Sequence, residues 1–248
     1  MDETQPTELN VADVLALLAK GELDVQGMLP WSSNYTLLVT VRADGLQGLA
    51  VYKPRRGERP LWDFTRGTLC QREVAAYVLS AALGWSLVPP TVLRDGPYGV
   101  GSVQLFIDAD QEAHLFTMQK ERRFDATIER LAAFDVLANN ADRKSGHCLK
   151  GNDGRLWAID HGICFHAEPK LRTVLWDYAG QPLRADILDD LRALRERLRR
   201  SGDEIAEALA ALLAADELRA LRKRLDRLVD TGKHPDPGPG RNVPWPPV

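Results

Sequence analysis

The 248-residue sequence predicts an α+β fold with a β-rich N-terminal lobe and a mostly helical C-terminal lobe. Short segments rich in β-branched and aromatic residues dominate the first part, which is typical of strands. Residues 184–229 are rich in Leu, Ala, Arg and Glu, which is typical of long helices. The end of the chain is rich in proline. We therefore expect an N-lobe at 1–107, a C-lobe at 108–234 and a tail at 235–248.

The N-lobe is expected to begin with a helix over Val11–Lys20, which Asn10 can cap and Gly21 can end. After Gly21 the apolar pattern changes to that of short strands. Asp44-Gly45 is a turn dipeptide between two of them. The expected strands are Glu22–Met28, Tyr35–Ala43, Gly48–Lys53, Thr91–Arg94 and Gly101–Ile107, and one internal helix is expected at Leu69–Leu83.

The C-lobe is expected to begin with an amphipathic helix at Ala126–Leu137, followed by a polar loop at Asn139–Gly146. Two short strands, His147–Lys150 and Leu156–Ile159, then form a hairpin. Their connection, Asn152–Gly154, has the composition of a tight turn.

Two long helices are expected between Arg184 and Val229, with a break near Ser201-Gly202. The proline-rich tail should have no regular structure, although its residues Trp245 and Val248 could pack it onto the body.

Composition argues against several classes of protein. The net charge is −3 and 27% of the residues are charged, which does not indicate a nucleic-acid binder held by bulk charge. No apolar run reaches the roughly eighteen residues that a membrane span needs. The N-terminus is acidic and polar, unlike a secretory signal, so we expect a cytoplasmic protein.

The three cysteines, Cys70, Cys148 and Cys164, are too few and too scattered for a disulfide framework. Cys148 adjoins His147 and Cys164 lies near His166, so zinc binding is an alternative, although the spacing matches no standard zinc pattern. We prefer the interpretation that the cysteines are small buried apolar residues.

Lys53 and Glu73 are the first candidate functional pair. Lys53 ends an expected strand, and Glu73 lies one turn into the helix that follows. A strand lysine paired with a helix glutamate positions the phosphates of ATP in kinases. The alternative is an ordinary surface lysine and a solvated glutamate.

Two aspartates form the second candidate set. Asp142 lies in a charge-dense polar loop that buries little apolar surface, and Asp160 follows eighteen residues later at the end of an apolar strand. A carboxylate at that position suits a metal ligand. Because a hairpin joins them, the two carboxylates should lie side by side at one end of it.

These segments resemble motifs of a known family. The loop Asp142–His147 is similar to the D-R-H-x-x-N catalytic loop of phosphatidylinositol 3-/4-kinases, and Asp160–Gly162 is similar to the D-F-G that follows it. The resemblance covers about Gly21–Phe165 and extends to bacterial members of this kinase-like group, which also includes the HipA toxins and the actin-fragmin kinases. It implies a two-lobed protein-kinase-like fold that uses ATP with Mg²⁺ or Mn²⁺.

The resemblance implies a role for each matching residue. Asp142 would orient or deprotonate the acceptor, and Asp160 would hold the metal between the phosphates. Lys53 would bind the α- and β-phosphates, and Glu73 would fix Lys53. The remaining nucleotide contacts would come from a loop over the phosphates, Ser32, Ser33 and Asn34, and from a hinge that reads adenine at Gln104–Ile107, including Gln104 and Phe106.

Two residues depart from the family pattern. His147 replaces the asparagine that binds the second metal, and imidazole suits Mg²⁺ poorly because hard cations prefer oxygen. Lys144 replaces a histidine and could offset charge on the transferred phosphoryl group. It could also keep Asp142 ionised and make it a weaker base.

The predicted function is therefore transfer of the γ-phosphoryl group of ATP to an unidentified protein, lipid or small-molecule acceptor. Phosphoinositide specificity is not indicated, because the stretch Cys164–Trp176, which would bind the headgroup, contains only Lys170 and Arg172 as basic residues. A nucleotide-binding pseudokinase and a protein adenylyltransferase are the alternatives. A purely structural network of Asp142, Arg143 and Asp160 is a further one.

Overall fold

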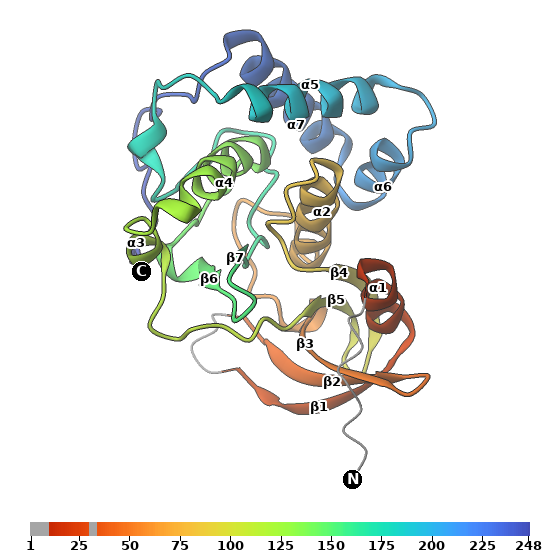
Figure 1. The fold of residues 1–248 in the computed structure, drawn as a ribbon. Coiled ribbons are helices and arrows are strands. Elements are labelled where there is room, and N and C mark those ends of the chain that lie inside the picture. The colour runs from red at the N-terminus through yellow and green to blue at the C-terminus, as the bar shows by residue number, and fades with distance from the viewer. Residues whose placement is uncertain (1–9, 30–33) are drawn as a thin grey trace. The chain divides into compact units, whose positions relative to one another are not determined.

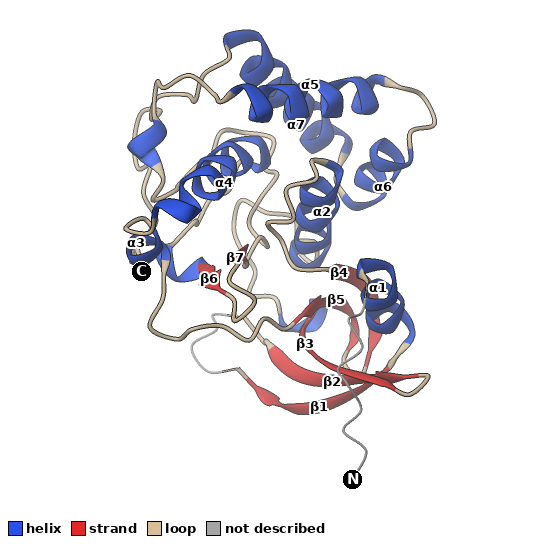
Figure 2. Cartoon of the chain, in the orientation of Figure 1, coloured by secondary structure: helices blue, strands red, loops and turns tan. Residues whose placement is uncertain are grey.

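The computed structural model describes residues 10–29 and 34–248, and it confirms the α+β architecture (Figure 2). The chain divides into two compact units. Unit 1 contains the chain up to Arg59 together with Pro90–Phe106, and unit 2 contains Pro60–Pro89 and Ile107–Val248. The helix at Leu69–Ala82 (α2) packs with unit 2, although we assigned it to the N-lobe. The three-part division of the chain at residues 107 and 234 stays a prediction.

Unit 1 is built on a five-stranded antiparallel sheet in the order β1-β2-β3-β5-β4 (Figure 1). In this order β3 and β5 are central neighbours, and Lys53 near the end of β3 lies opposite Ser102 on β5. The expected strands are confirmed with small shifts at their ends. Their bounds are β1 Glu22–Met28, β2 Leu37–Ala43, β3 Leu46–Pro54, β4 Thr91–Gly96 and β5 Gly99–Leu105.

Helix α1 (Val11–Lys20) forms as its sequence predicts and covers this sheet (Figure 1). The Asn10 side chain accepts a hydrogen bond from the Asp13 N–H at 3.0 Å, which satisfies one of the free donors at the helix start. Leu17 and Leu18 bury themselves on the sheet. Their partners are the inward-facing residues of the central strands, Leu37, Val39, Val41, Ala50, Tyr52 and Val103.

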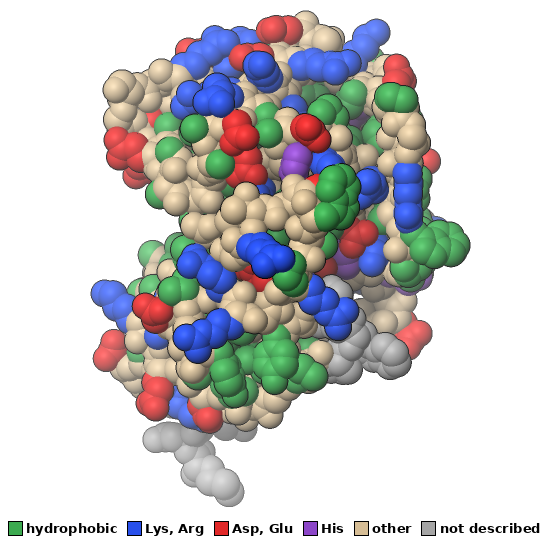
Figure 3. All heavy atoms as spheres, turned by 180° about the vertical axis from the view of Figure 1, so that it is seen from behind, with side chains coloured by type: hydrophobic (Ala, Val, Ile, Leu, Met, Phe, Trp, Pro, Cys, Tyr) green, Lys and Arg blue, Asp and Glu red, His purple; other side chains and the backbone are tan. Residues whose placement is uncertain are grey.

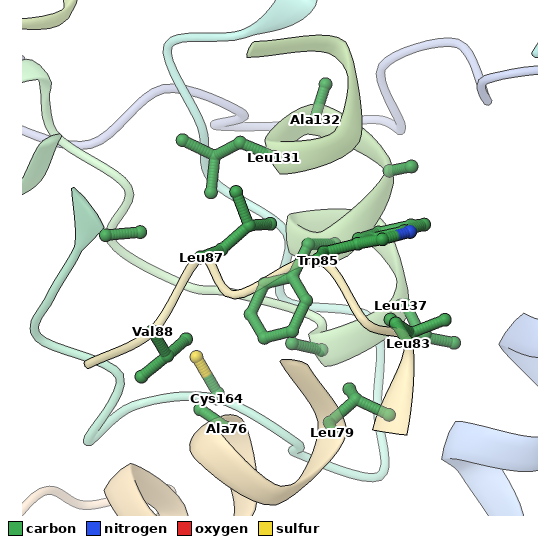
Figure 4. Close-up of a cluster of buried hydrophobic side chains, with 14 of the residues drawn as sticks. Ala76, Leu79, Leu83, Trp85, Leu87, Val88, Leu131, Ala132, Leu137 and Cys164 are labelled. Atoms are coloured by element: carbon green, nitrogen blue, oxygen red, sulfur yellow. The ribbon is translucent and has the colours of Figure 1, made fainter. Parts of the chain in front are cut away.

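Unit 2 is mainly helical and contains the two-stranded hairpin (Figure 2). Its core joins α2 to α4 and to the chain between α2 and β4, as shown by the side chains of Leu79, Trp85, Leu87 and Leu131 in Figure 4. The elements not yet given are α3 Leu115–Met118, α4 Asp125–Ala138, β6 Cys148–Lys150, β7 Leu156–Ala158, α5 Ala185–Arg199, α6 Glu204–Leu212 and α7 Ala215–Thr231.

The prediction of two long helices between Arg184 and Val229 was wrong in one respect, because the segment forms three. The break near Ser201-Gly202 is confirmed, but the second helix is interrupted again where Leu213 adopts an extended conformation. No glycine or proline marks this break. Glu217 stabilises it, because its carboxylate accepts the N–H of Ala214 at 3.0 Å and so caps the start of α7.

The tail has no regular structure, as predicted, but the expected anchors were wrong. Trp245 and Val248 are 76% and 61% exposed. The tail is held instead by its backbone, since the carbonyl oxygen of Asn242 accepts the N–H of Thr173 at 3.0 Å and the indole N–H of Trp176 at 2.8 Å. Polar backbone contacts of this kind leave no apolar signal in the sequence.

The surface carries acidic and basic side chains of both signs, interspersed on the face shown in Figure 3. No helix within the described residues is long and apolar enough to cross a membrane.

Candidate active site

The loop that carries Asp142 begins where α4 ends. Asn139 closes the helix in the left-handed conformation with φ of 51°, which asparagine tolerates better than most residues. Its side-chain amide donates to the carbonyl oxygens of His166 and Glu168 at 2.9 and 2.7 Å, and its amide oxygen accepts the N–H of Lys170 at 2.8 Å. One asparagine therefore joins the loop to the segment after Asp160.

Arg143 holds the loop in place through buried contacts. Its side chain is fully buried, and its Nε donates to both carboxylate oxygens of Asp135 at 3.1 Å. The guanidinium also donates to the carbonyl oxygen of Ile159 at 3.0 Å and lies 2.7 Å from Nε2 of His161. Burial lowers the pKa of Arg143, but Asp135 more than offsets this, so the group stays charged. These contacts define what we call the Arg143 network, formed by Asp135, Arg143 and His161.

Glu73 supports the segment Asp160–Gly162 within unit 2. Its side chain is buried on α2, and its Oε2 accepts the N–H of His161 at 2.9 Å. A Cβ atom on Gly162 would lie 3.5 Å from Oε1 of the same carboxylate. Glu73 therefore fixes the backbone next to Asp160. Lys53 belongs to unit 1, so its predicted ion pair with Glu73 stays a prediction.

Asp142 and Lys144 lie on the partly exposed side of the loop. Nζ of Lys144 lies 3.4 Å from Oδ2 of Asp142, and both side chains are about one-quarter exposed, at 22% and 27%. Burial raises the pKa of Asp142, Lys144 lowers it and the charge of Asp160 raises it further, and the net direction is upward. The effect of burial on the pKa of Asp142 therefore outweighs the opposite effect of Lys144.

Asp160 and His147 lie beside this pair. Nε2 of His147 is 3.4 Å from Oδ2 of Asp160, and the Asp160 side chain is 45% exposed. Asp160 has φ of 61°, a left-handed conformation that costs energy in a non-glycine residue and often occurs at functional sites. The predicted proximity of the two strand-end carboxylates is supported by the influence of Asp160 on the pKa of Asp142.

Asp160 and His147 together provide part of the ligand set that one divalent cation needs. Asp160 offers a carboxylate and His147 an imidazole nitrogen, and no group of three or more His, Cys, Asp or Glu that could hold a metal occurs in residues 10–29 and 34–248. A Mg²⁺ or Mn²⁺ ion bound by so few protein ligands would take its other ligands from phosphate and water.

The cysteines are buried free thiols, as we preferred. Burial raises the pKa of Cys148 to about 12 and that of Cys164 well above its ordinary value, as expected of thiols that pack as small apolar side chains.

The remaining predicted nucleotide residues lie in unit 1. Lys53 is half-buried near the end of β3. A Cβ on Gly101, which pairs with Pro54 on the neighbouring strand, would lie 2.5 Å from the Lys53 carbonyl oxygen, so glycine is required there. Oδ1 of Asn34 accepts the N–H of Arg59 at 2.9 Å. Ser32 and Ser33 lie outside the described residues.

Gln104 and Phe106 flank the end of β5. The Gln104 side chain is buried and donates to Oγ1 of Thr91 at 2.8 Å, so it serves the sheet. The N–H of Phe106 donates to the carbonyl oxygen of Leu49 at 3.0 Å. A backbone hydrogen bond from Phe106 to adenine would therefore use its carbonyl group.

Sequence reasoning missed two residues of the Arg143 network. Asp135 is a completely buried acid within an otherwise apolar helix face, and that lone charge in Phe134-Asp135-Val136 was the available signal. His161 was assigned no role, although it lies at the centre of the motif.

The sequence is similar to several known proteins. Protein Rv2133c of Mycobacterium tuberculosis is 43% identical over 268 residues, which cover 94% of this chain and 95% of that protein. Phosphatidylinositol 4-kinase gamma 4 of Oryza sativa is 33% identical over 43% of this chain, and phosphatidylinositol 4-kinase gamma 2 of Arabidopsis thaliana is 26% identical over 74%. The matches span only 22% and 38% of the length of these two plant proteins. No protein-family model matches the chain.

Two solved kinases share the fold. The Golgi casein kinase with Mn/ADP bound has a TM-score of 0.58 at 16% identity, covering 89% of this chain and 74% of that chain. The Helicobacter pylori proinflammatory kinase CtkA has a TM-score of 0.54 at 13% identity, covering 87% and 94%. The protein-kinase-like fold is thereby shown. The chain belongs to the family of protein Rv2133c, and it is distantly similar to the plant phosphatidylinositol 4-kinases gamma.

Proposed function

We propose that this protein is an ATP-dependent phosphotransferase whose reaction depends on Asp142 and Asp160. The proposal rests on the grouping of Asp142, Lys144 and His147 on one loop with Asp160, which follows β7, while the buried Arg143 network holds both segments. A similarity to phosphatidylinositol 4-kinases and a kinase-like fold support it.

In the proposed reaction, Asp142 accepts the proton of an acceptor hydroxyl. The hydroxyl oxygen forms a bond to the γ-phosphorus, the bond from that phosphorus to the β–γ bridging oxygen breaks, and ADP leaves. The raised pKa of Asp142 suits this role, because a base works best when its pKa approaches the working pH. Lys144 lies where it can offset negative charge on the transferred group.

Asp160, with His147 beside it, would hold a divalent cation against the phosphates. Such a cation would supply positive charge that offsets the negative charge of the phosphates. In unit 1, Lys53 would bind the α- and β-phosphates, with Asn34, Ser32 and Ser33 covering them.

Nucleotide binding is the first test. ATP with Mg²⁺ or Mn²⁺ should raise the melting temperature by about 5–10 °C at a hundredfold excess over Kd, since a ligand that binds only the folded state stabilises it. Asp160→Ala should remove this shift. Asp189→Ala, which removes an exposed carboxylate from α5, should keep it. No shift in the wild type with either metal would refute the proposal.

One observation favours a second candidate, a nucleotide-binding pseudokinase. His147 stands where the kinase family has the metal-binding asparagine, and its nitrogen lies beside Asp160. This candidate requires ATP binding without turnover, so measured ADP formation that is lost in Asp142→Asn would exclude it.

A further inference from the structure

Unit 2 contains a cavity of about 1060 Å³ beside α7. Its walls are α7, the segment 167–172 that follows the Asp160 motif, and residues 233–242 at the start of the tail. Neither Asp142 nor Asp160 lines it. The volume suits a small-molecule ligand. We call it the basic cavity because of its lining.

The charge of the lining is strongly one-sided. Among the described residues, seven lysines and arginines line the cavity, against two acids, Glu168 and Asp236. Only Lys170 among these cations forms ion pairs within the described part of the chain, with Asp63 at 2.8 Å and Glu168 at 4.0 Å. The other six cations have no counter-charge within ion-pair distance among residues 10–29 and 34–248.

Arg224 is the central feature of this lining. Its Nε donates to the carbonyl oxygen of Leu137 at 2.9 Å and its Nη1 reaches that of His166 at 3.4 Å. Its Nη2 is buried and has no hydrogen-bond partner among the described residues. Burial lowers the pKa of Arg224 to about 10, as expected of a cation without a carboxylate. A buried donor left unsatisfied costs about 1–3 kcal/mol, so the protein holds this guanidinium in the cavity wall without full compensation of its charge and donors.

Arg172 repeats the pattern on the opposite wall. Its Nε is buried without a hydrogen-bond partner in the described structure. Its backbone holds the catalytic loop, because its N–H donates to the carbonyl oxygen of Asn140 at 2.8 Å and its carbonyl accepts the N–H of Arg143 at 2.9 Å. A ligand on Arg172 would therefore contact the segment that holds the loop.

We propose that the basic cavity binds a small molecule carrying two or more phosphate groups, at a site separate from the nucleotide site. Guanidinium groups match phosphate oxygens in paired hydrogen bonds. Each phosphate brings nearly two negative charges, so two or more are needed to balance the excess of cations. Arg224 and Arg172 bind the phosphates inside the cavity, and Lys223 and Arg227 attract them at its exposed rim.

The test measures binding of inorganic tripolyphosphate without divalent metal by calorimetry. The wild type should bind, and binding should weaken as NaCl rises. The double variant Lys223→Glu with Arg227→Glu should lose about tenfold or more in affinity. The matched control, Arg219→Glu with Arg222→Glu, makes the same charge change at exposed positions of α7 outside the cavity and should bind as the wild type does.

Two further variants separate this site from the nucleotide site. Lys53→Met and Asp160→Ala should leave tripolyphosphate binding unchanged, so the basic cavity can fail or succeed independently of the proposed phosphotransferase. Arg224→Gln should weaken binding if it folds, and the rim variant decides the matter if it does not. Equal affinity in the rim variant and its control, or no binding by the wild type, overturns the proposal. Tighter binding of a doubly phosphorylated peptide than of tripolyphosphate, lost in the rim variant, overturns the assignment to a small molecule.

Discussion

The loop that carries Asp142 has a buried side and a partly exposed side, and the two differ in how closely their charged groups are paired. On the buried side, Arg143 and Asp135 are completely buried, and Nε of Arg143 lies 3.1 Å from each carboxylate oxygen of Asp135. On the partly exposed side, the Lys144–Asp142 and His147–Asp160 pairs have longer N···O distances, each 3.4 Å. The buried pair is committed to the fold, and the partly exposed pairs are the ones that we propose contact a ligand. On this proposal, stability and chemistry depend on neighbouring but different residues of one motif.

The largest expected effect is on the buried side. Asp135→Ala should lower the free energy of unfolding by about 3–5 kcal/mol, because it leaves the charge of Arg143 buried without its counter-ion. Urea denaturation measures this. The control Asp125→Ala, at the exposed start of the same helix, should cost no more than about 1 kcal/mol. Equal losses in both variants would show that the Arg143 network does not hold the fold.

On the partly exposed side, His147→Asn should change the metal preference of the enzyme with little change in the free energy of unfolding. The substitution puts an amide oxygen beside Asp160, and hard cations prefer oxygen. The ratio of ADP formation with Mg²⁺ to that with Mn²⁺ should rise by about tenfold, the scale on which changes around a bound metal alter affinity. An unchanged ratio would mean that His147 does not contact the metal.

Lys144→Met should shift the pH profile. Lys144 lowers the pKa of Asp142 while burial raises it, so removal of the cation should raise that pKa further. Since Asp142 must be ionised to accept a proton, activity falls as pH decreases through its pKa, and the acid limb should move to higher pH. A limb that stays in place or moves to lower pH would argue against Asp142 as the titrating base.

The smallest expected effect is on stability at the site itself. The pKa of Asp142 is higher in the folded protein than its ordinary value of 3.8, so its stabilising contribution is present below 3.8 and is lost as pH rises through the folded value. Near neutral pH, Asp142→Asn should therefore unfold at the same temperature as the wild type or slightly higher. A clear decrease in melting temperature would show that Asp142 stabilises the fold, as the buried Arg143 and Asp135 do.

Much of the fold follows from local sequence signals. Asn10 and Gly21 bound α1 as predicted, and the strand segments and the hairpin after the loop are confirmed. The break at Leu213 was missed because a side chain, Glu217, stabilises it in place of a glycine or proline.

The candidate site was predictable where its residues carry motif identity, as Asp142 and Asp160 do. It was not predictable where partners come from distant parts of the chain. The pairing of Glu73 with Lys53 stays a prediction, but the hydrogen bond of Glu73 with the backbone of His161, 88 residues away, was not predicted. Asp135 belongs to no recognised motif, because its role depends on the buried ion pair that it forms with Arg143 in the folded protein.

ADP formation from ATP tests the central claim most directly. The wild type and Asp142→Asn should be compared in Mg²⁺ and Mn²⁺ after thermal shifts have shown that both bind ATP. The account predicts ADP formation by the wild type and a rate about 10²–10⁴-fold lower in Asp142→Asn, the usual contribution of a positioned base. Equal rates in the two proteins, or AMP and pyrophosphate as the products of the wild type, would contradict it.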